Sequence, residues 1–141
     1  PVRVMGLIDR DPEFKTDRTT SAILDFGEGR QLTFTVSTQS VPYQRVNIFG
    51  TKGRLEVEIP FNAPQGGAMK LYMDDGKKLG DASAKVIKID KADQYQLEGE
   101  YFSRVVRGEE KLAYGVEDAI QQARILDAVF RSAKSGKWEK P

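Results

Sequence analysis

The hydrophobic periodicity of this chain changes once, and that change limits the folds open to it. Up to about residue 90, apolar and polar residues alternate, most strictly where Leu55, Val57 and Ile59 follow charged neighbours. A period of two predicts strands with one buried and one polar face. From Gln94 onward, apolar residues recur at helical spacing instead. Strands followed by helices predict an α+β fold.

The alternating part divides into runs that short turns separate. Glycine-bearing turns, such as Gly27–Gly29 and Gly50–Gly53, are typical of hairpins. We therefore expect a mainly antiparallel open β-sheet. The predicted strands cover residues 2–8, 19–26, 30–38, 44–49, 54–59, 69–73 and 85–89.

Two helices are expected after the strands. Asp93 is a suitable N-cap for a helix that begins at Gln94, and Gly108 is a suitable stop. A second helix is predicted over Val116–Ser135. Its expected apolar stripe comprises Val116, Ala119, Ile120, Ala123, Leu126, Phe130 and Ala133, widened by Ile125 and Val129. We expect both C-terminal helices to pack on one face of the sheet, within a single α+β domain over residues 1–141.

The other face of the predicted sheet is polar but uneven. Strand alternation places Phe49 among Thr33, Thr35, Arg45 and Asn47. A mixed face that no helix covers is available for oligomerisation. A solvated sheet face is the alternative interpretation of the same pattern.

Composition excludes several kinds of chemistry. The chain has no His and no Cys, which removes disulfides, thiolate catalysis and His-dependent nucleophile or metal sites. Its 22 basic and 21 acidic residues leave a net charge of +1, whereas proteins that bind nucleic acid are usually basic. The apolar runs are too short for a membrane helix. These features favour a cytoplasmic protein that contacts neither nucleic acid nor membrane.

The residues present do not form a catalytic set. Glu56 and Glu58 share a strand face with Arg54, which is typical of a surface charge pattern. Asp74 and Asp75 fall in a turn, where Asp forms local hydrogen bonds. The glycine pairs do not match a dinucleotide or phosphate-binding motif. We therefore expect no catalytic, cofactor-binding or metal-binding residue within this chain.

Three residues remain as candidates for contact with a small-molecule substrate. Tyr95 lies outside the apolar stripe of the first helix, and Phe61 and Asn62 precede Pro64 in a restrained loop. An aromatic ring and an amide on such a loop suit a pocket wall. The alternatives are a surface tyrosine at the sheet rim and a connection that proline merely restrains.

Several stretches resemble the C-terminal domain of the glucose–fructose oxidoreductase, inositol dehydrogenase and MocA-like family. The resemblance extends over nearly the whole chain, in the order expected. It rests on residues 25–29 (DFGEG), 46–57 (VNIFGTKGRLEV), 94–102 (QYQLEGEYF) and 115–138, which begin GVEDAI.

The resemblance implies a larger parent protein. Family members carry an N-terminal Rossmann domain that binds NAD or NADP, with a catalytic Lys in a Glu-Lys-Pro motif and an Asp/His stretch that acts on the substrate hydroxyl. The terminal Glu139-Lys140-Pro141 lies at the wrong end of the fold to be that motif. This chain is then the sheet domain without its catalytic half. It would form one wall of the substrate pocket, through Phe61, Asn62 and Tyr95, and a homo-oligomer through the open sheet face.

Two functional hypotheses follow. In the first, the chain is the non-catalytic C-terminal domain of an NAD(P)-dependent oxidoreductase that acts on a sugar, a polyol or a related hydroxy compound. In the second, it is a free-standing ligand-binding or protein-interaction scaffold.

Overall fold

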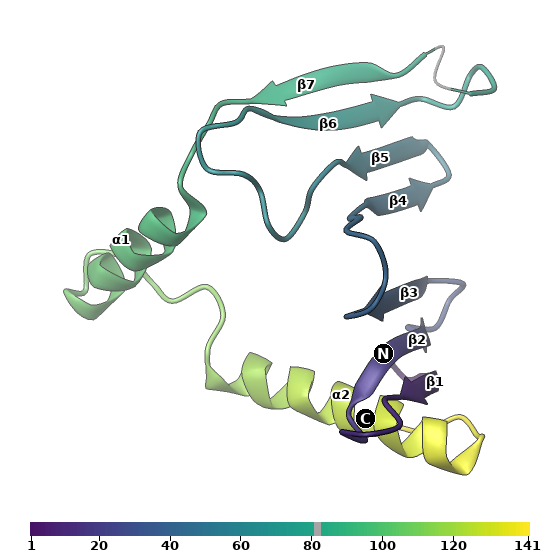
Figure 1. Cartoon of the computed structure of the whole chain (residues 1–141). Helices are drawn as coiled ribbons and strands as arrows, with labels where there is room; N and C mark the ends of the chain where they lie inside the picture. Colours follow the sequence, from purple (N-terminus) through teal and green to yellow (C-terminus); the bar gives the residue numbers. More distant parts are fainter. Residues whose placement is uncertain (81–82) are drawn as a thin grey trace. The chain divides into compact units, whose positions relative to one another are not determined.

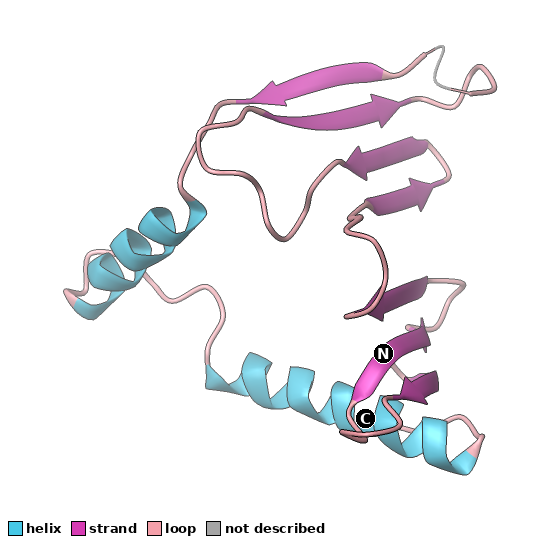
Figure 2. Cartoon of the chain, viewed as in Figure 1, coloured by secondary structure: helices cyan, strands magenta, loops and turns pink. Residues whose placement is uncertain are grey.

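The computed structural model describes residues 1–80 and 83–141, so Asp81 and Ala82, within the expected last hairpin, lie outside the described residues. The α+β class, the antiparallel pairing and both helices are confirmed (Figures 1 and 2). The strands are β1 (Arg3–Arg10), β2 (Asp17–Asp25), β3 (Gln31–Ser37), β4 (Val46–Gly50), β5 (Gly53–Val57), β6 (Met69–Asp74) and β7 (Lys85–Ile89). The helices are α1 (Gln94–Val106) and α2 (Val116–Ser135).

The described strands form two sheets, where the sequence indicated one. One has the order β1-β2-β3 and the other β4-β5-β6-β7. The chain correspondingly divides into two compact units. The first unit joins Pro1–Val41 with Ala113–Pro141, and the second is Pro42–Leu112. The single-domain interpretation stays a prediction.

The first unit has its core between the three-stranded sheet and α2. Register pairs Val4 with Leu24, and Leu24 with Leu32, so these side chains share one sheet face. The core on this face consists of Val4, Ala22, Leu24, Ala128 and Val129, with Phe34 and Ile125 packed against it.

A glycine sets the distance between α2 and the sheet. A Cβ atom on Gly6 would lie 2.6 Å from the carbonyl oxygen of Val129 and 2.8 Å from its Cγ1. Both separations are shorter than van der Waals contact, and one atom is backbone that cannot turn away. Gly6 is therefore required for the close approach of α2 to β1.

The same contact is completed by a buried serine. Ser132 exposes none of its surface, and its Oγ accepts a hydrogen bond from the backbone N–H of Gly6 at 3.0 Å. Its hydroxyl donates to the carbonyl of Lys137 at 2.6 Å. Because a buried hydroxyl without partners is costly, Ser132 links β1, the end of α2 and the chain beyond it.

The C-terminal residues extend along the free edge of β1. Val4 and Glu139 exchange both backbone hydrogen bonds, at 2.8 and 3.0 Å. The Arg3 guanidinium lies 4.6 Å from the ring centroid of Trp138, a cation–π geometry. The terminal segment therefore pairs with an edge that would otherwise be open.

The face that α2 buries agrees with the predicted stripe only in part, since Val129 belongs to the core and Ile125 packs against it. Its buried residues are Ala128, Val129 and Ser132, whereas Val116 is 65% and Leu126 56% exposed. The physical reason is the close approach at Gly6, which favours small side chains on the contacting face. The helical spacing of apolar residues centred the predicted stripe on a neighbouring face.

The second unit contains an antiparallel sheet with one apolar face. One row across its four strands is Ile48, Leu55, Met73 and Lys85. The next row is Val46, Val57, Leu71 and Ile87. Helix α1 belongs to this unit, and its packing on a sheet face stays a prediction.

The opposite face of this sheet carries ion pairs. Arg45 contacts Glu56 at 3.0 Å, and Arg54 contacts Asp74 at 3.4 Å. The expected surface charge pattern at Glu56 is confirmed by these contacts. Phe49 shares this face by register with Arg54 and is 76% exposed.

None of the helices among residues 1–80 and 83–141 is both long and apolar enough to cross a membrane.

Replacing Gly6 with Ala should destabilise the first unit, because the added methyl group meets the Val129 carbonyl. Overpacking of this kind costs roughly 1–3 kcal/mol of unfolding free energy, which urea denaturation monitored by circular dichroism would measure. Gly99→Ala is the matched control. A Cβ there meets no atom within 4 Å, and Ala favours a helix over Gly. Equal stability of Gly6→Ala and wild type would contradict the close approach.

Candidate functional site

The loop after β5 presents two of the three predicted substrate-contact residues. Its far end is a tight turn, in which the N–H of Gly67 donates to the carbonyl of Pro64 at 3.2 Å. Gly66, the third residue of the turn, has φ = +81°, which type II turns require and L side chains rarely adopt. Proline and glycine therefore fix one end of the loop that carries Phe61 and Asn62.

The other end of the loop is held by the side chain of Gln44. Its Oε1 accepts hydrogen bonds from the backbone N–H groups of Phe61 and Asn62, both at 3.2 Å. Its Nε2 donates to Oδ1 of Asn62 at 2.7 Å. One half-buried carboxamide thus makes three hydrogen bonds to two consecutive loop residues.

A second glutamine connects this loop to α1. Nε2 of Gln94 donates to the carbonyl of Phe61 at 3.3 Å. The helix begins there because the Asp93 carboxylate accepts from the N–H groups of Tyr95 and Gln96, at 3.0 and 3.2 Å. The predicted N-cap is confirmed. The structure therefore holds Phe61 and Asn62 against the first turn of α1, where Tyr95 follows Gln94.

The rings of this site are open to a ligand. Phe61 is 65% and Tyr95 60% exposed. Tyr95 also lines a shallow groove of about 610 Å³ along one face of α1, together with Glu100, Arg104 and Arg107. Neither Phe61 nor Asn62 lines this groove. We call Gln44, Phe61, Asn62, Gln94 and Tyr95 the amide cluster.

The side chains of the amide cluster carry no formal charge near neutral pH. Three are carboxamides and two are aromatic. A carboxamide can donate and accept hydrogen bonds but does not act as a general acid or base near neutral pH. The cluster can orient a polar, uncharged molecule, and its chemistry is that of binding.

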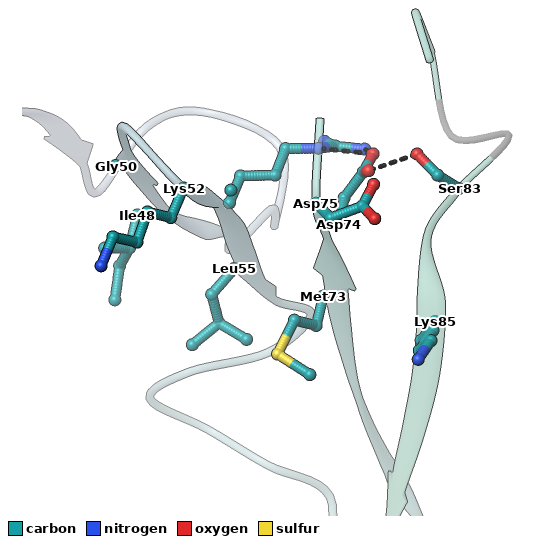
Figure 3. Close-up of a pocket in the computed structure, with 11 residues that line it drawn as sticks. Ile48, Gly50, Lys52, Leu55, Met73, Asp74, Asp75, Ser83 and Lys85 are labelled. Carbon is teal, nitrogen blue, oxygen red and sulfur yellow. Dashed lines mark hydrogen bonds and ion pairs between the residues drawn. The ribbon is translucent and has the colours of Figure 1, made fainter. Parts of the chain in front are cut away.

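A different pocket lies at one end of the four-stranded sheet (Figure 3). It encloses about 480 Å³ and includes the row Ile48, Leu55, Met73 and Lys85. None of the predicted contact residues lines it. We take the amide cluster as the better candidate, because this pocket is the end of an apolar sheet face whose carboxylates are engaged with near neighbours.

Asp74 is the most enclosed of those carboxylates, with only 3% of its side chain exposed. It accepts from the Ser83 hydroxyl, from the N–H of Gly76 at 2.9 Å, and from Arg54 at 3.4 Å. These donors, the serine first, lower the pKa of Asp74 below its ordinary 3.8. The expected turn role of Asp74 is confirmed.

Within the part of the chain that the structure describes, no cluster of three or more acidic side chains is arranged to hold a metal ion.

Sequence patterns did not identify the roles of Gln44 and Gln94. Gln44 lies 17 residues from Phe61, and an amide that bonds across that distance leaves no periodic signal. Gln94 was visible only as the first residue of a helix. Both residues are glutamines in chain segments that lie beside the loop in the structure, and their residue type was the only hint in the sequence.

Comparison with known proteins gives a consistent family. Residues 1–56 match a family model described as the GFO/IDH/MocA C-terminal domain. The chain is 40% identical over 139 residues to the oxidoreductase ORF334 of Rhizobium meliloti, spanning 99% of this chain and 42% of that protein. It is 27% identical over 137 residues to D-xylose 1-dehydrogenase (NADP(+)) 2 of Haloferax volcanii, spanning 96% and 40%. The chain thus spans about two fifths of the length of these relatives.

Solved structures show the same fold at low sequence identity. The aldose-aldose oxidoreductase of Caulobacter crescentus, complexed with glycerol, matches with a TM-score of 0.74 and 19% identity, over all of this chain and 41% of that one. A 3-ketoreductase of Actinomadura kijaniata, in complex with NADP and TDP-benzene, matches with a TM-score of 0.79 and 18% identity, over 92% and 40%.

The lowered pKa of Asp74 predicts how its contribution to stability varies with pH. The contribution is complete above the ordinary pKa of 3.8 and is lost as pH falls through the lower folded-state value. Asp74→Asn should therefore be less stable than wild type at pH 7. The difference should shrink as the pH falls below 3.8.

Urea unfolding at pH 7 and at a pH below 3.8 measures the difference in stability between Asp74→Asn and wild type. Asp90→Asn is the control, since Asp90 is exposed just after the end of β7. A stability gap for Asp74→Asn that does not depend on pH would contradict the assignment.

Proposed function

Since the chain is similar to the C-terminal domain of the GFO/IDH/MocA family, we propose that it forms one wall of the substrate pocket in an NAD(P)-dependent oxidoreductase. The substrate is a sugar, a polyol or a related hydroxy compound. The amide cluster supplies the wall, and the catalytic residues and the dinucleotide site lie in an N-terminal Rossmann domain of the parent protein.

The observation that carries this proposal is the composition of the amide cluster. Exposed rings at Phe61 and Tyr95 offer flat apolar surfaces for the C–H groups of a sugar, and the amide of Asn62 offers polar contact. The names of relatives support the same substrate class, since one is a D-xylose dehydrogenase and another binds glycerol as an aldose-aldose oxidoreductase.

A nicotinamide dinucleotide, NAD or NADP, in the parent protein and the cytoplasmic location stay predictions. Two relatives are named with NADP, which favours NADP for the parent protein. This 141-residue chain itself is proposed to bind neither dinucleotide and to have no catalytic activity alone.

The proposal extends to self-association through the face that carries Phe49. An aromatic residue 76% exposed beside ordered ion pairs has the character of an interface core with a polar rim. We expect a dimer or larger homo-oligomer.

The enzymatic part is tested in the full-length protein that contains this chain. Replacing Asn62 with Ala should raise KM for an aldose or polyol by about 2- to 10-fold, the loss of one hydrogen bond, with a smaller change in kcat. Reduction of NADP⁺ with D-xylose, other aldoses and polyols gives the rates, and Gln65→Ala in the same loop is the control. A lower kcat with unchanged KM would contradict a binding role for Asn62. Tight binding of NADPH by the 141-residue chain would contradict the placement of the dinucleotide site in another domain.

The self-association is tested by sedimentation at micromolar concentration. The Phe49→Asp variant should dissociate, because a charge would be buried at the centre of the interface. Gln39→Asp, which adds the same single negative charge at an exposed position outside the four-stranded sheet, controls for net charge. A wild-type monomer, or an oligomer indifferent to Phe49→Asp, would contradict this surface.

A further inference from the structure

The hydrogen bonds within the amide cluster determine which way each carboxamide faces. Backbone N–H groups can only donate, and those of Phe61 and Asn62 both point to one terminal atom of the Gln44 side chain, at 3.2 Å. That atom must be the oxygen. The other terminal atom of Gln44 is therefore its NH₂ group.

The orientation of Gln44 in turn determines that of Asn62. The NH₂ group of Gln44 lies 2.7 Å from a terminal atom of Asn62 and must donate to it. The accepting atom is thus Oδ1, and the remaining terminal atom of Asn62 is the Nδ2 amide. Among the described residues, none accepts a hydrogen bond from Nδ2 of Asn62, and Asn62 is exposed.

We propose that Gln44 is a positioning residue that holds Asn62 with its Nδ2–H₂ donors outward, and that these donors bind an acceptor oxygen of an uncharged polyhydroxy ligand. This inference rests on the proposed function, since it concerns the same pocket wall. The inference adds which partner donates the hydrogen bond between Asn62 and the ligand. The two backbone N–H groups orient the Gln44 amide, the Gln44 amide orients Asn62, and Asn62 is then the donor toward the ligand.

The side chains that surround Asn62 fit an uncharged ligand, and the two arginines of the groove beside Tyr95 are paired with Glu110 and Glu109. Every side chain of the cluster is an amide or an aromatic ring, and the neighbouring Asp93 carboxylate is already engaged by the N–H groups of Tyr95 and Gln96. Gln94 holds the Phe61 carbonyl at 3.3 Å, so that acceptor is also engaged. The polar atom that Asn62 leaves available to a ligand is Nδ2, which is a hydrogen-bond donor.

A single substitution reverses this polarity without releasing the loop. In Gln44→Glu, the carboxylate still accepts from both backbone N–H groups, but its second oxygen can only accept. Asn62 must then rotate so that Nδ2 donates inward and Oδ1 faces out. Gln65→Glu is the matched control, because it adds the same charge at an exposed position of the same loop.

The experiment observes side-chain NH₂ signals by NMR in the ¹⁵N-labelled chain and its two variants, whose spectra also report folding. In the free wild type, we expect the Asn62 NH₂ to exchange with solvent as fast as that of Gln65, and the Gln44 NH₂ to be protected. In Gln44→Glu, the Asn62 NH₂ should become protected. Titration with D-xylose, and with glycerol, should shift the Asn62 NH₂ in wild type and Gln65→Glu, with the shift lost in Gln44→Glu.

The remaining outcomes separate this inference from the proposed function. A protected Asn62 NH₂ in the free wild type overturns the inference even if the variant fails to fold. Shifts at the backbone amides of Phe61 and Tyr95 without a shift of the Asn62 NH₂ also overturn it, and leave the pocket wall standing. If neither probe shifts any of these signals, the pocket wall and the inference both fail.

Discussion

The close approach of α2 to β1 is the constraint on which the first unit depends. Gly6 has no Cβ, so the Val129 carbonyl can lie where a side chain would begin. Ser132 then reaches the Gly6 N–H, and through Lys137 it holds the start of the C-terminal segment that pairs with Val4. The first and last parts of the chain are thereby joined in one unit, with residues 42–112 contributed between them as the second.

The second unit is organised by side chains that satisfy backbone groups. Asp93 caps α1, Asp74 closes the turn after β6, and Gln44 binds two consecutive N–H groups of the loop after β5. Each removes an unpaired donor where the backbone leaves regular structure. The amide of Gln44 differs because its second terminal group remains free to act on a neighbour. A contact that stabilises the loop therefore also decides what Asn62 presents.

Most of the elements could be predicted from local patterns. Alternation located the strands, and Asp93 and the helical spacing located α1 and α2, since these signals arise within a few residues. The division into two sheets and the buried face of α2 could not be predicted this way. Both depend on which surfaces meet. A serine such as Ser132 and a small residue such as Ala128 do not stand out as core residues until α2 is known to lie against Gly6. Likewise, Phe61, Asn62 and Tyr95 were selectable as unusual residues, whereas Gln44 matters only through a contact 17 positions away.

The amide cluster contains no carboxylate, no amine and no imidazole, which bears on how binding and proton transfer divide in such an enzyme. Histidine is missing from the whole chain, and carboxamides keep one protonation state across the range in which oxidoreductases operate. Binding by this wall therefore depends on geometry and on donor–acceptor polarity, not on pH. Under the proposed function, any proton transfer and its pH dependence belong to residues of the dinucleotide-binding part. In that proposal the wall holds substrate oxygens in one orientation, a role that requires the loop to be anchored by Gln44, Gln94 and the Pro64–Gly67 turn.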